Sequence, residues 1–464
     1  MANDAELKLV FNHVDIKAQD PGALSRAQWA QNRRQNAATI TQYNARKDIK
    51  QSQLGLTYTQ QLNPNHSLLL SGYVGQRHNK QYLAIPRATQ TRSSGHAGGV
   101  IDLTRTYYGL DSRWQYQNDA QTLKYSLGVN YDEVREDRQG YENFVGSNLG
   151  VRGNLRRDED NRIFNLDPYM QLQWRPSEKW TFDGGLRYST VQFRSKDHYL
   201  SNGDDSGKAR YHQWLPSAGV SYRLAPQTSL YAAYSRGFET ATLLEMSYRP
   251  DGVGGLNFAL QPLTSHNYEA GVKHRLLGGL LTAALYRTDT DNDIVSAGTV
   301  DGRATYRNAG KTKRQGFELG WQGKLYKDLN LTLSYNYIDA KFDESNGSIV
   351  KGRRIPGIAR QTAYAALGWQ PQQGLRGGFD IQYSDKVYVD NANSEYAPSY
   401  TTVGAYMGYR WQKNHWVIDA TARVDNLFDR DYAATVILND NNGRYYEPSL
   451  PRNYTFGLNV SYRF

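Results

Sequence analysis

The sequence predicts an all-β fold, a transmembrane antiparallel β-barrel of about 18 strands with long extracellular loops and short periplasmic turns. Three observations support this fold class. The end of the chain alternates between apolar and polar side chains, short turns alternate with long polar loops, and aromatic residues are abundant, with 36 Tyr, 13 Phe and 9 Trp. No hinge or shift of composition divides the 464 residues, so we expect residues 1–464 to form one barrel domain.

The last predicted strand, residues 454–464, has one apolar and one polar face. Its apolar face carries Phe456, Leu458, Val460, Tyr462 and the terminal Phe464, with polar residues and glycine between them. Such a strand separates two different media. The ending resembles the terminal strand by which outer-membrane barrels are recognised for assembly, which implies the barrel-assembly machinery as a partner.

Composition excludes several other classes of protein. The mean hydropathy is −0.74, and no stretch contains the roughly 20 apolar residues that a spanning helix requires. The net charge of +10 is spread along the chain without a compact basic run, so we expect no nucleic-acid partner. Residues 1–4 do not resemble a signal peptide, and we expect one to have been removed or left out. A secreted sandwich or a propeller remains open as an alternative, although no blade-length repeat occurs.

The predicted strands follow one another along the whole chain, each near the roughly 9–11 residues of a tilted membrane strand. They are residues 7–15, 53–61, 67–76, 108–116, 123–133, 164–174, 180–193, 213–223, 229–236, 268–274, 281–288, 315–325, 331–339, 361–369, 377–383, 401–411, 416–425 and 454–464. On residues 416–425, Trp416 and Ile418 share the apolar face, while Asp419 and Arg423 share the polar face that we expect to line the interior.

The connections support a membrane barrel more strongly than the strands do. Long polar loops are expected at residues 18–47, 77–104, 135–162, 195–210, 237–262, 289–312, 340–360, 384–398 and 426–450, and they alternate with short turns. Outer-membrane barrels have long extracellular loops and short periplasmic turns. An even strand number places both chain ends at the periplasmic side, so we expect residues 7–15 to pair antiparallel with residues 454–464.

Short motifs occur in order along the C-terminal two thirds of the chain. They are YSRGF at 234–238 leading to LE at 244–245, LTSHNYEAGVK at 263–273, NAGK at 308–311 through GFEL at 316–319, IPG at 355–357, NLFDRDY at 426–432 and PR at 451–452. Together they resemble the TonB-dependent outer-membrane receptors, gated transporters of ferric siderophores, haem, cobalamin and similar scarce ligands. The sequence QYN at 42–44 resembles the members that handle iron complexes.

This resemblance implies a receptor in the outer membrane of a Gram-negative bacterium, with a ferric siderophore or other iron complex as ligand and the TonB complex as energising partner. Such receptors have 22 strands and an N-terminal plug in the lumen. The predicted strands are about four fewer, and nothing before Leu7 resembles a plug or the TonB-binding motif. We therefore expect the barrel portion of a receptor, not competent for gated transport by itself. The alternative is a passive, porin-like pore.

No group of residues predicts catalysis, so we expect no enzyme and no covalently bound cofactor. The nine His are scattered. Asp289, Asp291 and Asp293 resemble the start of a calcium loop, but Ile294 and Val300 stand where that loop needs Gly and Glu. Arginine pairs occur at 33–34, 156–157 and 353–354. They can bind lipopolysaccharide phosphates, and solvated loop charge is the alternative. Outer-membrane lipid and lipopolysaccharide are thus expected partners.

Capture of a ferric chelate needs an aromatic surface for its apolar periphery and cations for its negative charge. The predicted loop 77–104 offers both, with Asp102 as the only acid among its basic residues. The candidate region for binding the small-molecule chelate comprises Arg77, Lys80, Tyr82, Arg87, Arg92, Trp29, Tyr396, Arg444, Tyr445 and Tyr446. Packing within the loops is the alternative for each of them.

Overall fold

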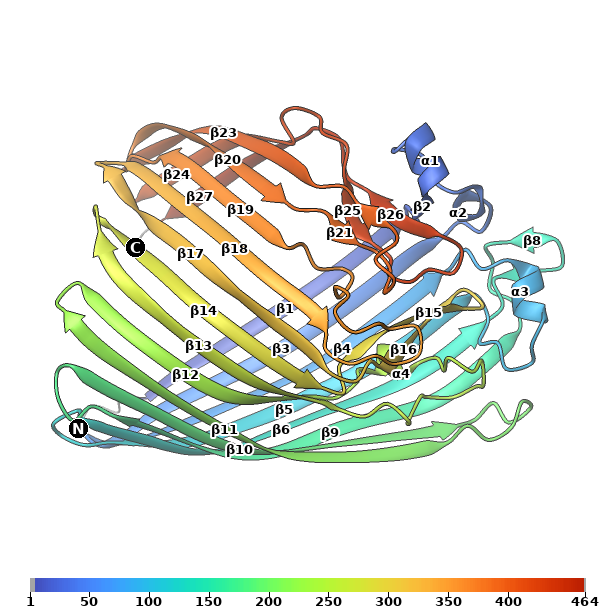
Figure 1. Cartoon of the computed structure of the whole chain (residues 1–464), viewed down its shortest axis with the longest axis horizontal. Helices are drawn as coiled ribbons and strands as arrows, with labels where there is room; N and C mark the ends of the chain where they lie inside the picture. The colour runs from blue at the N-terminus through green and yellow to red at the C-terminus, as the bar shows by residue number, and fades with distance from the viewer. Residues whose placement is uncertain (1–4, 463–464) are drawn as a thin grey trace.

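The computed structural model describes residues 5–462, and one antiparallel sheet of 18 strands dominates it (Figure 1). Each strand pairs with the next strand of the sheet in chain order. The strands are β1 (Ala5–Gln19), β3 (Arg46–Asn63), β4 (His66–Tyr82), β5 (Val100–Gln117), β6 (Leu123–Tyr141), β9 (Leu155–Trp174), β10 (Trp180–Asp197), β11 (Gly207–Ala225), β12 (Thr228–Glu239), β13 (Leu263–Leu276), β14 (Gly279–Asp291), β17 (Thr312–Tyr326), β18 (Leu329–Phe342), β19 (Gln361–Trp369), β20 (Gly374–Ser384), β23 (Tyr400–Lys413), β24 (Trp416–Asp425) and β27 (Asn453–Tyr462). The predicted fold class and strand number are confirmed.

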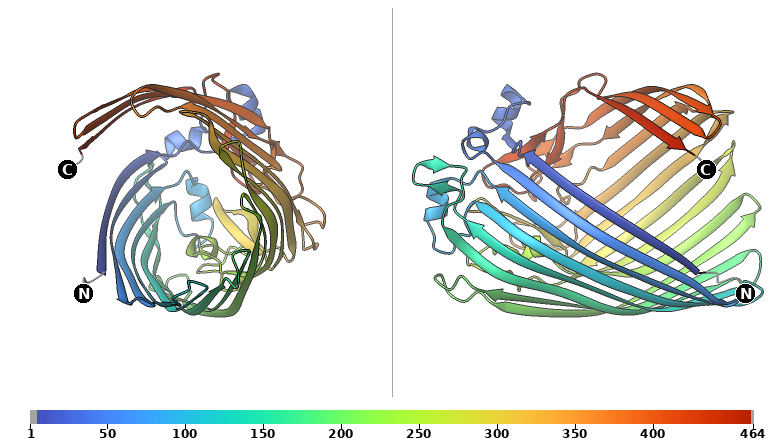
Figure 2. Two further views of the ribbon diagram at one scale, coloured as in Figure 1. Left: turned by 90° about the vertical axis from the view of Figure 1, so that its left-hand side faces the viewer. Right: turned by 180° about the vertical axis from the view of Figure 1, so that it is seen from behind.

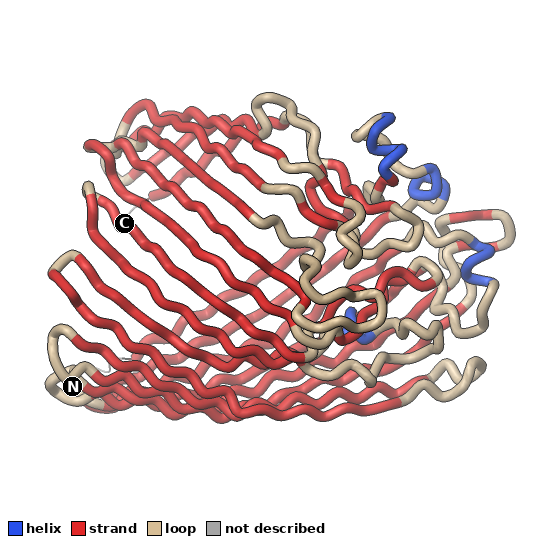
Figure 3. Tube along the Cα trace, in the orientation of Figure 1, coloured by secondary structure: helices blue, strands red, loops and turns tan. Residues whose placement is uncertain are grey.

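The remaining elements are short and gather with the long loops at one end of the sheet (Figures 1 and 3). They are β2 (Leu24–Ser25), α1 (Arg26–Gln31), α2 (Ala38–Gln42), α3 (Arg87–Thr91), β7 (Phe144–Val145), β8 (Asn148–Leu149), α4 (Leu243–Met246), β15 (Ile294–Val300), β16 (Arg303–Asn308), β21 (Val387–Tyr388), β22 (Tyr396–Ala397), β25 (Ala433–Val436) and β26 (Arg444–Pro448). Within residues 5–462, none of the helices has the length and apolar character needed to cross a membrane.

The two faces of the strands differ as their alternating sequences predict. On β27, the apolar side chains are exposed, with Phe456 at 82%, although Phe464 lies outside the described residues. On β24, Trp416 is exposed on the outer face, while Arg423 pairs with Asp380 of β20 at 2.8 Å on the other. The outer face is therefore apolar, and the charges of the inner face neutralise one another between strands.

Many strands are longer than the sequence predicts, because their polar ends continue the hydrogen-bonded ladder beyond the apolar belt. The strands β3, β6 and β9 have 18, 19 and 20 residues. The predicted loop 77–104 is wrong in its bounds, since β4 extends to Tyr82 and β5 begins at Val100. Arg77, Lys80 and Tyr82 consequently lie on a strand, and the connecting loop is residues 83–99.

The predicted pairing of residues 7–15 with residues 454–464 is also wrong for the described residues. The ladder of β1 joins it to β3, the ladder of β27 joins it to β24, and no ladder connects β1 to β27. Figure 2 shows the two strands standing apart, so that the sheet curves around an interior without closing. Barrel diameter grows with strand number, and the curvature of this sheet is too gentle for its strands to meet.

Candidate ligand-binding site

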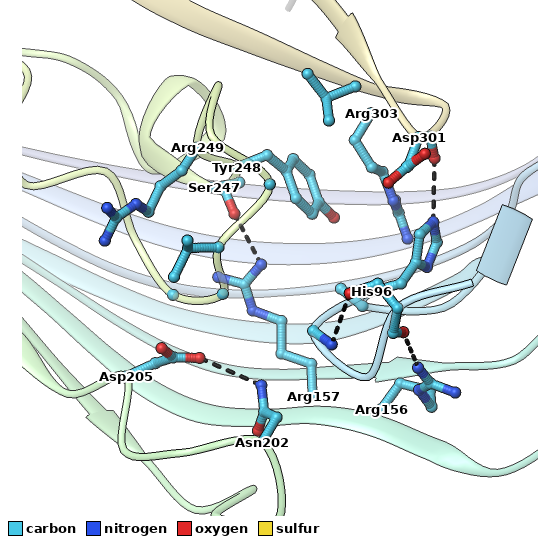
Figure 4. Close-up of a pocket in the computed structure, with 18 of the residues that line it drawn as sticks. His96, Arg156, Arg157, Asn202, Asp205, Ser247, Tyr248, Arg249, Asp301 and Arg303 are labelled. Atoms are coloured by element: carbon cyan, nitrogen blue, oxygen red, sulfur yellow. Dashed lines mark hydrogen bonds between the residues drawn. The ribbon is translucent and has the colours of Figure 1, made fainter. Parts of the chain in front are cut away.

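The candidate site is a small cavity at the loop-bearing end of the barrel, with a volume of about 60 Å³. Segments far apart in sequence line it: the loop between β4 and β5, the first residues of β9, the loop between β10 and β11, the loop after α4, and the turn between β15 and β16. Figure 4 shows His96, Arg157, Tyr248 and Arg303 meeting around it. These side chains come from four of the five segments.

The helix α4 fixes the position of Tyr248. A capping box begins the helix, because the Thr242 amide donates to the Glu245 carboxylate at 2.8 Å and the Glu245 amide donates to Thr242 Oγ1 at 3.2 Å. Leu243 and Met246 of α4 are buried in an apolar cluster with Phe193 of β10. The chain leaving this anchored helix therefore carries Tyr248 into the interior.

Three guanidinium groups surround the Tyr248 ring. Those of Arg138, Arg157 and Arg303 lie 5.5, 5.5 and 4.8 Å from its centroid, and Arg138 donates to the phenol oxygen at 3.0 Å. Burial raises the pKa of Tyr248, but the charges of Arg303, Arg138 and Arg157 outweigh it, so the pKa lies below its ordinary value. The cluster thus favours negative charge at this point.

Arg303 is the cation of this cluster that lacks an acidic partner. Arg157 pairs with Glu159 at 2.8 Å, and Arg138 lies 3.9 Å from the same carboxylate. Arg303 is only 5% exposed and donates to the Gly98 carbonyl, but its Nε has no hydrogen-bond partner. Within residues 5–462, no carboxylate lies at ion-pair distance from it. Burial lowers the pKa of Arg303, and the positive charges of Arg138 and Arg157 lower it further. The interaction with Tyr248 raises this pKa, but by less than the other effects lower it.

The opposite wall of the cavity carries acidic groups. Asp205 and Asp197 line it, and Asn202 donates to Asp205 at 3.4 Å (Figure 4). Burial raises the pKa of Asp205, and the nearby charge of Asp197 adds to this effect. The arrangement can therefore bind an anionic group beside Arg303 and a hydrogen-bond donor on the other side. No group of three or more metal-ligating side chains occurs among the described residues.

His96 lies in the loop between β4 and β5, and its neutral ring connects this loop to Asp301 at the cavity. The Gly98 amide donates to His96 Nδ1 at 2.9 Å, so Nε2 carries the proton and donates to the Asp301 carbonyl at 3.0 Å. Burial lowers the pKa of His96 below its ordinary 6.5, and the charges of Arg303 and Arg156 lower it further, while the contacts with Asp301 oppose them. The neutral ring is therefore the form that the loop requires.

We predict that acid loosens the loop between β4 and β5. The folded pKa of His96 is lowered, so the neutral ring is kept at no cost in stability at and above neutral pH. As pH falls below about 6.5, the ring in the unfolded loop takes up a proton more readily than the folded ring does, and the loop therefore loses stability. The protection factor of the amides around Gly98, which corrects for the slower intrinsic exchange at lower pH, should fall between pH 7 and 5, as measured by mass spectrometry. His96→Asn should remove this pH dependence, and an unchanged profile in that variant would contradict the assignment.

The aromatic candidates of the sequence gather at a second place, around α1, β22 and β26. Trp29 and Tyr446 are buried with their ring centroids 5.3 Å apart. The Tyr446 hydroxyl donates to the Glu395 carboxylate and accepts from Arg26 at 3.0 Å. Tyr445 packs against the same cluster. The Tyr396 carbonyl accepts from Arg26 and from the Tyr446 hydroxyl, each at 3.2 Å, and Arg444 reaches Thr39 at 3.4 Å. These contacts join the loops to one another.

The basic candidates are distributed over both faces of the wall. Lys80 lies 3.6 Å from Asp102, and Arg46 stacks 3.6 Å from the centroid of the buried Tyr82 ring. Arg87 donates to the Gly146 carbonyl at 3.0 Å, and Arg77 occupies β4. Arg92 pairs with the Asp301 carboxylate at 3.4 Å, and the carbonyl of the same Asp301 accepts from His96. Among the basic candidates, Arg92 is thus the one connected to the cavity.

The sequence-based interpretation missed Tyr248 and Arg303. It noted the arginine pair at 156–157, of which both members line the cavity, but no short motif joins them to residues about a hundred positions away. Of the other arginine pairs, Arg34 contacts Asp429 at 2.9 Å. Asp293 of the supposed calcium pattern pairs instead with Arg314 at 2.7 Å.

Comparison with known proteins identifies the family. The family model described as TonB dependent receptor-like, beta-barrel matches residues 5–427. The probable TonB-dependent siderophore receptor PiuA of Acinetobacter baumannii is 27% identical over 296 residues, which are 60% of this chain and 38% of that protein. The ferrioxamine B receptor of Salmonella typhimurium is 27% identical over 271 residues, 57% of this chain and 36% of that protein. The matched residues of the chain thus span less than half the length of these relatives.

Solved structures show the same fold at low identity. The ferric yersiniabactin uptake receptor FyuA of Yersinia pestis superposes with a TM-score of 0.78 and 18% identity, covering 100% of this chain and 68% of that one. The ferric citrate transporter FecA superposes with a TM-score of 0.77 and 18% identity, covering 98% and 67%. With the family match extending over most of the sheet, the chain belongs to the TonB-dependent receptor β-barrel family of Gram-negative outer-membrane proteins.

Proposed function

We propose that this chain is the barrel of a TonB-dependent outer-membrane receptor that captures an anionic ferric chelate. The observation that carries the proposal is the buried Arg303, which lacks a carboxylate partner and faces a cavity among the loops. A buried unpaired cation is costly, and an anionic group of the ligand would supply the missing charge. The names of the relatives, a siderophore receptor and a ferrioxamine B receptor, support an iron complex as ligand.

The size of the cavity limits what enters it. At about 60 Å³, it is several times the roughly 10–15 Å³ that a single water needs on the same measure, so it accommodates one small group and not a whole ferric chelate. A carboxylate or one catecholate arm of a chelate fits this limit, and the iron-bearing body would remain above it. Tyr248 offers a ring to such an arm, and Arg303 offers its free Nε. Specificity would then come from the charge and shape of a single arm.

Binding of chelates with different charges tests this proposal. The refolded barrel in detergent should bind an anionic ferric tris-catecholate more tightly than the cationic ferrioxamine B complex, as measured by quenching of tryptophan fluorescence. Rising salt should weaken the anionic complex only slightly, because a buried pair is screened less than exposed charges are. Equal affinities for the two complexes would contradict a site built around an unpaired buried cation.

Passive conduction is the second candidate function, because barrels of about 16–18 strands enclose an aqueous channel. The described sheet has 18 strands. Planar-bilayer recording separates the two functions: a pore conducts steadily whatever chelate is added, whereas a receptor site near the lumen makes the current sensitive to the anionic complex.

A further inference from the structure

Four basic residues form one transverse row on the outer face of the wall, near its loop-bearing end. In the sheet register, Arg135 of β6 lies opposite Arg162 of β9, Arg162 lies opposite Arg194 of β10, and Arg194 lies opposite Lys208 of β11. Like charges directly opposite each other on neighbouring strands are destabilising. A row of four across adjacent strands therefore needs negative charge from elsewhere.

The protein itself supplies this charge to only half of the row. Glu133 pairs with Arg135 at 2.6 Å and with Arg162 at 2.7 Å. Arg194 and Lys208 are exposed, as is Arg210 in the next register position below. Within residues 5–462, the side chains of these three residues have no ion pair or hydrogen bond. We call Arg194, Lys208 and Arg210, together with Arg162, the outer basic patch.

On the far wall, outward-facing cations have acidic partners on their own strands. On β14 and β18, Arg287 pairs with Asp289 at 2.9 Å and Lys341 pairs with Asp339 at 2.8 Å. Lys313 of β17 lies opposite both Asp289 and Lys341 in the register. The outer basic patch is therefore a local departure from a pattern that the same barrel follows elsewhere.

The patch forms a pocket directly above apolar surface. Arg162, Phe164, Gln192, Arg194, Lys208 and Arg210 line a surface pocket of about 520 Å³. Further along the same strands, Tyr188 and Trp214 lie opposite each other with ring centroids 4.7 Å apart, and Trp214 is 55% exposed. Leu166 and Met170 of β9 are exposed on this face as well. Cations thus stand at the rim of an aromatic and aliphatic belt, where headgroups meet acyl chains.

We propose that the outer basic patch binds the phosphorylated headgroup of an anionic glycolipid in the outer leaflet. Arginine binds phosphate oxygens through paired, charge-assisted hydrogen bonds, and two phosphates would neutralise Arg194, Lys208 and Arg210. The acyl chains of the same lipid lie against Leu166, Met170 and Trp214 below. Two residues beyond Arg194 toward the loops, Lys196 lies opposite Asp160 in the register. The negative charge of Asp160 marks the end of the patch on that side.

Binding of a bis-phosphorylated, acylated glucosamine disaccharide tests this proposal. The refolded full chain in detergent is titrated with this lipid, and the bound lipid is counted by native mass spectrometry. The variant R194Q/K208Q/R210Q should bind about tenfold more weakly or worse, because it removes the charge-assisted contacts. The matched control R287Q/K313Q/K341Q loses the same three charges from the far wall and should bind like the unchanged protein. The mono-phosphorylated lipid should show an intermediate affinity.

Several outcomes would overturn the proposal. They are equal weakening in the two triple variants, which would indicate attraction by net charge alone, and unchanged binding in R194Q/K208Q/R210Q. Binding of inorganic phosphate with the affinity of the lipid would show that the patch recognises a free anion instead. Heat-modifiable gel migration checks that each variant is folded, and the single variant R194Q replaces the triple one if that fails to fold.

Discussion

Replacing Glu159 with glutamine should lower the free energy of unfolding by about 3–5 kcal/mol, because it leaves buried guanidinium groups without a counter-charge. The Glu159 carboxylate is almost fully buried, accepts from Arg157 at 2.8 Å and from Asn161 at 2.8 Å, and lies 3.9 Å from Arg138. Urea unfolding of the barrel in lipid vesicles, followed by tryptophan fluorescence, measures the change. Hydrogen exchange on β9 shows whether the loss is local to the loop-bearing end.

A second substitution separates charge balance from simple disruption. In the double variant E159Q/R303Q, the removal of one cation should restore part of the lost stability, since the two sites face the same cavity. Glu178→Gln, in an exposed turn at the opposite end, should change stability by less than about 0.5 kcal/mol. If E159Q behaves like E178Q, the buried network does not contribute to stability as its geometry indicates.

Replacing Arg303 with glutamine should weaken binding of the anionic ferric chelate by about 10- to 100-fold, the loss expected for one buried hydrogen bond to a charged group. The same variant should be as stable as the unchanged barrel or more so, because it removes an uncompensated buried charge. Fluorescence titration and urea unfolding measure the two effects on one preparation. Loss of binding together with gain of stability would identify Arg303 as a residue kept for its ligand.

The control for this prediction is Arg175→Gln, which removes an exposed arginine from a turn at the other end of the barrel. It should leave both affinity and stability unchanged. A loss of affinity for cationic and anionic chelates alike in R303Q would indicate a collapsed cavity. Unchanged affinity for the anionic complex would place the ligand elsewhere, and the loop cluster around Trp29 and Tyr446 would then be the next region to test.

The strands could be predicted because their signal is local. Alternation along β24 or β27 depends only on which residues face lipid, and each of the 18 predicted ranges overlaps one strand of the sheet. Strand ends could not be predicted in the same way. The residues of β4 beyond the apolar belt, such as Arg77 and Lys80, are polar on both faces, so they resemble a loop although the ladder with β5 continues through them.

The sites could not be predicted because they depend on register and on loop packing. Arg135, Arg162, Arg194 and Lys208 form a row only once the ladders between β6, β9, β10 and β11 are known. Arg303 and Tyr248 meet because α4 and the β15–β16 hairpin fold into the interior together. From the sequence, Trp29 and Tyr446 are candidates for ligand binding, with packing within the loops as the alternative; their rings pack 5.3 Å apart, but composition alone does not say which aromatic ring faces a cavity.

The separation of β1 from β27 affects the mechanics of the wall. In a closed barrel, strand number and shear together fix the circumference, whereas a sheet with two separate edges can widen or narrow by small changes of twist between neighbouring strands. The cross-section of this chain is therefore elastic. Any quantity that scales with that cross-section, such as single-channel current, should be spread over a range of values in the isolated chain, and a single sharp value would require something that holds the two edges at a set distance.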